Sequence, residues 1–245
     1  IISSGIIPAG LEMMDKLATQ AAEDFVHANY PMAEALLLCE LDGTQSEIDQ
    51  QMDKVSQILK ACNSHDIRLS QNNQERALFW AGRKAAFPAV GRISPDYYCM
   101  DGTIPRKSLP EVLGKISNFS TKYGLRVANV FHAGDGNLHP LILYDANKAG
   151  DLEKAENFGA DILKYCVDKG GTITGEHGVG VEKIDQMCHQ FHTPELNKFH
   201  SIKALLDETG ILNPGKAIPS LHRCAELGAM HVHNGKLPPP DIPRF

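Results

Sequence analysis

The chain has 245 residues, of which 42% are hydrophobic and 22% are charged, an ordinary composition for a globular protein. Its formal charge of −6 argues against a nucleic-acid-binding surface, which requires clustered basic residues. No apolar run approaches the ~20 residues that span a bilayer, and the six scattered cysteines include no C-x-x-C pair, which favours a reducing compartment.

Strand and helix patterns alternate through the first two-thirds of the chain. Thr44 with Glu47, and Ser108 with Glu111, have the spacing of capping boxes, and each pair opens a predicted helix. In chain order the patterns predict a buried strand at 35–41, a helix to about residue 62, a strand near 66–70, a helix at about 73–87, a strand at 97–104, a helix to about 123, strands at 126–132 and 138–144, and a helix at about 151–168. This order predicts an α+β fold, a ferredoxin-like antiparallel sheet with helices on one face.

The strand signals stop after Gly180, which divides the chain into two predicted parts. Residues 1–175 form the α+β domain, and residues 176–245 form a small helical C-terminal region with an extended tail. A helix is predicted over about 193–210, because Thr-Pro is a favourable start and Gly a favourable end. The prolines at 238–240 predict that the tail is extended against another surface.

The segment His132-Ala-Gly-Asp-Gly-Asn-Leu-His139 lies between two predicted strands. Asp135-Gly136 is typical of a two-residue type I′ turn, in which both central residues have positive φ. In that register His132 lies directly opposite His139 on one face of the hairpin. Two imidazoles so placed can bind one metal ion at ~2.1 Å per bond. The alternative is two polar residues at the end of a sheet, in a chain that has 11 histidines.

Glycines flank Glu176 and His177 in the segment Gly170–Gly180, and they allow the backbone to turn sharply near a ligand. A carboxylate can supply the third ligand to a two-histidine metal site and leave a position open for substrate. The adjacent histidine can act as a base, because its ordinary pKa is near the working pH. The glycine spacing fits neither a dinucleotide-binding motif nor a Walker loop. A flexible surface loop is the alternative interpretation.

Three motifs in this order resemble the signatures of FAD-linked oxidases of the vanillyl-alcohol oxidase superfamily. They are His132-Ala-Gly-Asp-Gly-Asn-Leu-His139, Gly175-Glu-His-Gly-Val-Gly180 and Asn213-Pro-Gly-Lys216. Phe79-Trp-Ala-Gly-Arg-Lys84 and residues 94–105 narrow the resemblance to the glycolate oxidase FAD-subunit and D-lactate dehydrogenase type. The resemblance covers only the C-terminal half of such proteins. We therefore expect that the N-terminal FAD-binding domain is absent from this chain, which begins at an apolar isoleucine rather than at methionine.

The resemblance implies a metal-dependent oxidation of a 2-hydroxy acid. His132, His139 and Glu176 match the ligands of a divalent metal ion, for which Zn, Mn or Fe would suit the donor set. His177 matches the catalytic base that takes the hydroxyl proton while the α-hydrogen leaves as hydride to FAD. The fragment by itself is expected to be inactive.

Arg83 matches an arginine that binds the substrate carboxylate, and Asn213 and Lys216 match a segment that returns toward the flavin cofactor. Without the resemblance, a surface ion pair is the alternative for Arg83. Relatives that act on 2-hydroxyglutarate carry a second carboxylate-binding lysine on the strand that here holds Cys99. Although Arg106 is near in sequence, the lack of that lysine favours a small monocarboxylate, glycolate or D-lactate.

The resemblance also implies partners: the chain's own N-terminal FAD domain, a second flavin-binding subunit and an iron–sulfur subunit, in the cytoplasm or at the surface of the inner membrane. Two alternatives remain from the residues alone. One is a stand-alone metal-binding or interaction module without redox activity, and the other is a metal-dependent hydrolase in which His177 activates a metal-bound water. His231 and His233 are interpreted as solvent or interface residues rather than a chelating pair.

Overall fold

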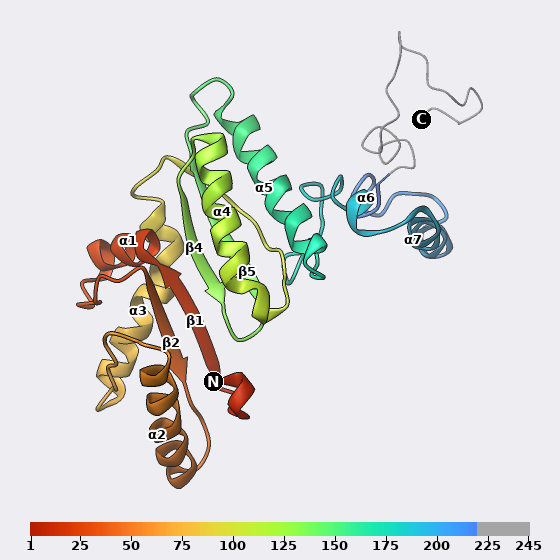
Figure 1. Cartoon of the computed structure of the whole chain (residues 1–245). Helices are drawn as coiled ribbons and strands as arrows, with labels where there is room; N and C mark the ends of the chain where they lie inside the picture. Colours follow the sequence, from red (N-terminus) through yellow and green to blue (C-terminus); the bar gives the residue numbers. More distant parts are fainter. Residues whose placement is uncertain (220–245) are drawn as a thin grey trace.

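Five strands form one sheet in the computed structural model, which describes residues 1–219 (Figure 1). The strands are β1 (Gly10–Asp15), β2 (Ala35–Glu40), β3 (Asp96–Cys99), β4 (Val127–His132) and β5 (Asn137–Tyr144). They lie in the order β2-β1-β4-β5-β3, and every neighbouring pair is antiparallel. The predicted α+β class with an antiparallel sheet is confirmed. The predicted extended tail, His231 and His233 lie outside the described residues.

Helices cover both faces of the sheet, whereas the sequence predicts them on one face. The helices are α1 (Lys16–Val26), α2 (Gln45–Ala61), α3 (Asn73–Val90), α4 (Leu109–Tyr123), α5 (Asp151–Asp168), α6 (Met187–Gln190) and α7 (Thr193–Leu206), with 3₁₀ turns at Ile2–Ser4 and Arg106–Ser108. Helices α4 and α5 lie on one face, and α1 and α3 lie on the other (Figure 1). The cause is that residues 137–143 of β5 are all buried, so both faces of the central strands need an apolar cover.

Strand alternation sorts the apolar side chains into two cores. The α4/α5 face contains Met13 of β1, Phe131 of β4, and Leu138 and Ile142 of β5. The α1/α3 face contains Met14, Val130, Leu141 and Leu143 of the same strands, packed against alanines of α1 and α3. Because successive residues point to opposite faces, each central strand contributes to both cores.

The N-terminal region departs most from the sequence prediction. Neither β1 nor α1 is predicted, although Asp15 is a signal for the helix: it is the N-cap, and its carboxylate accepts a hydrogen bond from the N–H of Ala18 at 2.9 Å. The predicted buried strand β2 lies at the edge of the sheet, and Leu37 is 42% exposed there. The predicted strand at 66–70 is absent. Arg68 in that segment donates instead to the carbonyl of Asn29 and to Asp66.

Only one of the two predicted capping boxes forms. At the start of α2, Glu47 accepts from the N–H of Thr44 at 2.8 Å, and the Thr44 hydroxyl accepts from the N–H of Glu47. At the start of α4, the Ser108 side chain makes no capping hydrogen bond. Glu111 there accepts hydrogen bonds from Tyr165 and Lys169, so its side chain connects α4 to the end of α5.

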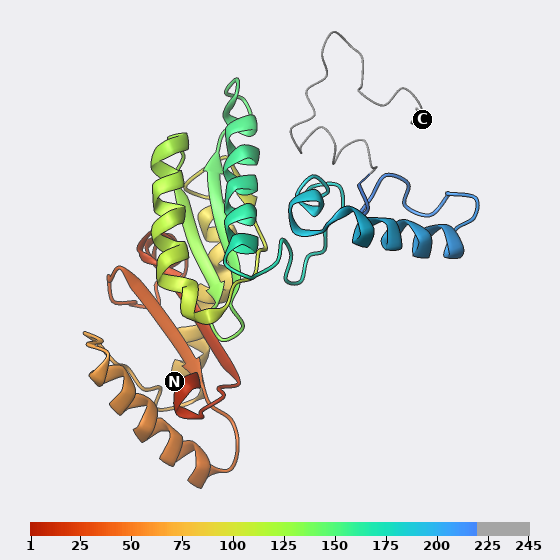
Figure 2. The same ribbon diagram turned by 45° about the vertical axis from the view of Figure 1, so that its right-hand side comes forward.

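Helices α6 and α7 extend away from the sheet beyond the loop that follows α5 (Figure 2). Helix α7 has Pro194 in its first turn, as predicted, but it ends at Leu206 and is capped by Asp207 rather than by Gly210. Within residues 1–219, every helix is too short or too polar to cross a membrane.

Candidate metal and substrate site

His132 and His139 lie on the α1/α3 face of the β4–β5 hairpin, but they are not directly opposite each other. His132 pairs with Asn137, and His139 pairs with Val130. The two histidines are therefore diagonal neighbours, with ring centroids 5.1 Å apart. The predicted register is wrong by two residues, yet the predicted proximity is confirmed, because a shift of two residues keeps a side chain on the same face.

The connection between the strands explains the difference in register. Residues 133–136 form a four-residue connection, in which the N–H groups of Asp135 and Gly136 both donate to the carbonyl of His132, at 3.1 and 3.0 Å. Within this connection Gly136 alone has a positive φ, 81°. A type I′ turn needs positive φ at both central residues, so the predicted two-residue turn is excluded.

Three imidazoles converge on one carboxylate oxygen, Oε1 of Glu176. The Nε2 atom of His139 lies 2.8 Å from it, that of His177 3.5 Å and that of His132 3.7 Å. The rings of His139 and His177 stack, with centroids 5.1 Å apart. His139 is 2% exposed, and this burial lowers its pKa, which favours the neutral imidazole. The side chains of Glu176 and His177 are about half exposed, so the cluster is open on one side.

Asp101, immediately after β3, holds the loop that carries Glu176 and His177. Its carboxylate accepts hydrogen bonds from the backbone N–H groups of Gly175, Glu176 and His177 at 2.9–3.2 Å, and from the hydroxyl of Thr174 at 2.6 Å. Three consecutive N–H groups bound to one carboxylate fix the backbone of this loop. The loop is therefore anchored at its base, which argues against the flexible-loop interpretation.

A buried ion pair supports this anchor. Lys183 donates from Nζ to Oδ2 of Asp101 at 2.9 Å, and both side chains are almost fully buried. Burial opposes the charge on Asp101, but the hydrogen bonds from Thr174, Lys183 and the loop N–H groups outweigh burial and hold the pKa of Asp101 well below its usual range. Sequence reasoning missed both residues. Asp101 lies in one of the segments that carry the family resemblance, residues 94–105, but nothing near Lys183 in sequence indicates its buried partner.

Arg83 does not lie on the surface. It is 9% exposed, and its Nε and Nη2 atoms contact Oε2 of Glu12 at 3.0 and 2.8 Å. The other oxygen of Glu12, Oε1, lies 2.9 Å from Nδ1 of His132. Glu12 faces His132 directly across the β1–β4 pair. Sequence reasoning missed Glu12 because it did not predict β1.

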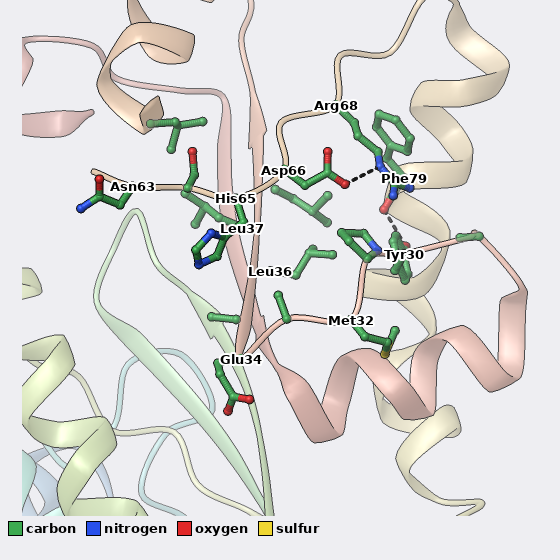
Figure 3. Close-up of a pocket in the computed structure, with 17 residues that line it drawn as sticks. Tyr30, Met32, Glu34, Leu36, Leu37, Asn63, His65, Asp66, Arg68 and Phe79 are labelled. Atoms are coloured by element: carbon green, nitrogen blue, oxygen red, sulfur yellow. Dashed lines mark hydrogen bonds and ion pairs between the residues drawn. The ribbon is translucent and has the colours of Figure 1, made fainter. Parts of the chain in front are cut away.

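The position of Arg83 in α3 is set by the preceding residue, Gly82. The hydroxyl of Tyr30 accepts a hydrogen bond from the N–H of Gly82 at 2.8 Å. It also donates to the carbonyl of Phe79 at 2.7 Å (Figure 3). A Cβ atom at position 82 would lie 2.2 Å from the Tyr30 ring. Glycine is therefore required for Tyr30 to approach the backbone of α3 this closely.

The cluster around Glu176 fits a divalent metal ion by its donor chemistry. Ligand atoms that bind one ion at ~2.1 Å lie roughly 3.0–3.4 Å apart, and the three separations from Glu176 Oε1 span 2.8–3.7 Å. Among residues 1–219, Asp101, His139, Glu176 and His177 have possible ligand atoms within 4.8 Å of one another. Asp101 fits less well than His132, because its carboxylate already accepts N–H groups and the ammonium of Lys183, which would repel a cation.

Asn213 and Lys216 lie apart from this cluster, in the exposed segment after α7. Their side chains approach each other at 3.5 Å, and the neighbouring N–H of Ala217 donates to the carbonyl of Gly180 at 2.7 Å. The segment thus returns to the end of the glycine-flanked loop. Within the described part of the chain, neither side chain hydrogen-bonds a member of the cluster.

A separate pocket of about 740 Å³ lies between β2, the segment 63–68 and α3 (Figure 3). Apolar side chains such as Met32, Leu36 and Leu37 line it, and Asp66 and Arg68, which also line it, pair with each other. No predicted site residue lines this pocket. The cluster around Glu176 lies elsewhere, at the hairpin end of the α1/α3 face.

Comparison with known proteins shows the family of the chain. Residues 1–217 match the family model "FAD linked oxidases, C-terminal domain". The chain is 62% identical over its whole length to the glycolate oxidase subunit GlcD of Escherichia coli K12, of which it covers 49%. It is 33% identical over 217 residues to GlcD of Bacillus subtilis, covering 88% of this chain and 46% of that protein. A mitochondrial D-lactate dehydrogenase (cytochrome) of Arabidopsis thaliana is 29% identical, with 90% of this chain and 39% of that protein covered.

Solved structures with the same fold include p-cresol methylhydroxylase with substrate bound and 4-ethylphenol oxidase from Gulosibacter chungangensis. Each has a TM-score of 0.64 and 14% sequence identity, and they cover 89% and 90% of this chain and 48% and 50% of their own chains. At this identity the likeness concerns the fold alone. The chain spans about half the length of the curated relatives that it matches.

Proposed function

The chain belongs to the family of FAD-linked oxidase C-terminal domains, and on this premise we propose that it is the substrate-side half of an FAD-dependent 2-hydroxy-acid dehydrogenase. The reaction would oxidise glycolate or D-lactate to the 2-oxo acid. The observation that supports this proposal is the convergence of His132, His139 and His177 on Glu176. The glycolate oxidase subunits and the D-lactate dehydrogenase among the relatives suggest the substrate class.

In this proposal His132, His139 and Glu176 hold a divalent metal ion. When bound, the ion would polarise the substrate hydroxyl, and FAD would accept the hydride. His139 is suited to be a ligand because burial favours its neutral form. Glu176 supplies the anionic ligand from a loop that Asp101 anchors. The exposed side of Glu176 leaves room for a substrate to approach.

His177 is the proposed base. Its Nε2 atom lies 3.5 Å from Glu176 Oε1, so a hydroxyl bound next to Glu176 would be within its reach. Because the loop N–H of His177 is held by Asp101, its backbone is fixed while its half-exposed ring can receive a proton.

Arg83 is proposed to bind the substrate carboxylate, with a restriction. Its Nε and Nη2 atoms already contact Glu12, so a bidentate clamp on the substrate would require Glu12 to move. A single contact through the remaining nitrogen is the arrangement that leaves the Glu12 pair intact.

A small monocarboxylate suits the polar groups nearby. Burial raises the pKa of Cys99 to about 12, so this position supplies a neutral thiol and no cation. Arg106 donates to the carbonyl of Gly134 at 2.9 Å. Cys99 offers no cation and Arg106 already binds a backbone carbonyl, so a second substrate carboxylate would lack a dedicated partner there. This favours glycolate or D-lactate over 2-hydroxyglutarate.

The proposal extends to the rest of the protein. An N-terminal FAD-binding domain would occupy the half of the relatives that this chain does not cover, and residues 1–175 and 176–245 would form its cap and a helical extension. Asn213 and Lys216 would approach the flavin. A second flavin-binding subunit and an iron–sulfur subunit would receive the electrons, in the cytoplasm or at the inner membrane surface.

The test is anaerobic flavin reduction in the full-length protein. Glycolate or D-lactate should bleach the flavin absorbance, 2-hydroxyglutarate should do so poorly, and a chelator should abolish the bleaching until Zn²⁺ or Mn²⁺ is restored. Bleaching that survives complete metal removal would contradict the metal site. Product release from an ester or amide without bleaching would indicate a hydrolase instead.

A further inference from the structure

The proposed metal ligand His132 is linked to Arg83 through Glu12. The metal site alone does not explain these two contacts. We propose that Glu12 is a positioning residue that fixes the orientation of His132, and that Arg83 acts on the metal through Glu12. This inference rests on the proposed function, in which His132 is a ligand. It assigns a role to a strand residue that the sequence motifs do not include.

Each carboxylate oxygen of Glu12 contacts a different residue. Oε1 lies 2.9 Å from Nδ1 of His132, and Oε2 contacts Arg83. Glu12 and His132 are directly paired across β1 and β4, so the backbone sets their distance. The side chains of Glu12 and Arg83 are 13% and 10% exposed, which keeps water from replacing either contact.

The contact selects one tautomer of His132. An ionised carboxylate can only accept hydrogen bonds, so Nδ1 of His132 must carry the hydrogen. In this tautomer Nε2 is the nitrogen left to bind a metal ion, and it lies on the side of Glu176. His139 follows the same rule, because its Nδ1 faces the carbonyl of Met100 at 3.3 Å and its Nε2 faces Glu176.

Arg83 keeps Glu12 in the required state. A carboxylate buried to this degree needs a compensating charge, and the guanidinium contacts it through two nitrogens. Without the guanidinium, the Glu12 side chain would lose the two contacts that hold its orientation. Arg83 touches no member of the cluster around Glu176 directly, so it affects His132 only through Glu12.

The chain contains a control for this arrangement, a more exposed ion pair between the same helix and another strand. Arg76 and Glu40 form a second ion pair between α3 and a strand of the same sheet, but here the strand is the edge strand β2. Glu40 pairs in register with Gly10, two residues before Glu12 in β1. This pair contacts no histidine among the described residues, so it reproduces the loss of a strand–helix ion pair without affecting a metal ligand.

The experiment measures Zn²⁺ affinity of the full-length protein by competition with a chromophoric chelator. Glu12→Ala should lower the affinity about 10- to 100-fold. Glu12→Gln keeps an acceptor for Nδ1 and should lose less. Arg83→Met should lower the affinity at least about threefold when Glu12 is present and have no further effect in Glu12→Ala. Glu40→Ala and Arg76→Met should leave it unchanged.

A second readout uses metal-free protein with ¹⁵N-labelled histidines. The NMR spectrum should show His132 protonated on Nδ1 in the wild type, and this preference should disappear in Glu12→Ala. Equal Zn²⁺ affinity of Glu12→Ala, Glu12→Gln and wild type, or an equal effect of Arg83→Met in both backgrounds, would overturn the inference. A wild type that binds no metal would overturn the proposed function, while the tautomer of His132 still decides the role of Glu12.

Discussion

The two faces of the sheet use the same strands for different purposes. Phe131 and His132 are neighbours in β4, yet Phe131 is fully buried in the apolar core under α4 and α5 while His132 points to the opposite face and joins the cluster around Glu176. In β5, Leu138 and His139 divide in the same way. A strand that ends in a hairpin can therefore place reactive side chains on one face, while the apolar side chains on its other face pack in the core and fix the strand.

The difference lies in how each face gains its stability. The α4/α5 face gains free energy from apolar burial, which does not depend on orientation. The hairpin end of the α1/α3 face depends on directed contacts: Glu12 with His132, and Asp101 with the loop before His177. Substitutions on the first face should change the free energy of unfolding, and substitutions on the second should change binding and turnover.

The largest expected effect is from His132→Ala. With two ligands remaining, the full-length protein should lose its metal and its turnover. Metal content is measured by elemental analysis after dialysis, and the thermal midpoint of the metal-free protein should stay close to that of the metal-free wild type. A variant with full metal content would show that His132 is not a ligand.

His177→Ala should separate binding from chemistry on the same face. The metal should remain, while turnover with glycolate should fall roughly 10²- to 10⁴-fold, the usual contribution of a positioned base. Steady-state kinetics and metal analysis on one preparation are the measurements. If metal is lost here but retained in Glu176→Ala, the roles of these two neighbours are reversed.

Phe131→Ala tests the opposite face at the next residue along the strand. The cavity left in the α4/α5 core should lower the free energy of unfolding by about 3–5 kcal/mol. Metal content per folded molecule should stay at the wild-type value. Chemical denaturation gives the first quantity, and a parallel loss of metal from the folded protein would contradict the division between the faces.

Asp161→Asn should have the smallest effect. Burial opposes the charge of Asp161, but hydrogen bonds from Lys122 and Tyr123 outweigh burial and lower its pKa. A lowered pKa stabilises the fold above the ordinary value of 3.8, and this contribution is lost as the pH falls through the folded-state pKa. Because the site is solvated, the difference at pH 7 should be below about 1 kcal/mol and vanish in acid. Denaturation at several pH values measures it, and metal affinity should not change.

Much of the cluster around Glu176 was predictable because its residues lie in short segments that contain glycines. The spacing from His132 to His139 placed both on one face, and the glycines around Glu176 and His177 marked their loop. The register was not predictable from Asp135-Gly136, because the turn type depends on how residues 133–136 use the carbonyl of His132.

The supporting residues could not be found in the same way. Asp101 and Lys183 are separated by 82 positions and meet only in the folded chain. Glu12 lies in a strand without a clean alternating pattern, and its partners come from β4 and α3. The second helical layer was missed for a related reason: burial of β5 on both faces depends on where α1 packs, and α1 was not predicted.

The contact between Tyr30 and Gly82 has a consequence for engineering the substrate range. Gly82 is not one of the proposed metal ligands, so its importance for the site is not obvious from the ligand set. Any larger residue there would overlap the Tyr30 ring and displace the turn of α3 that carries Arg83. In a saturation library at position 82, variants should therefore be depleted whichever substrate is used in the screen.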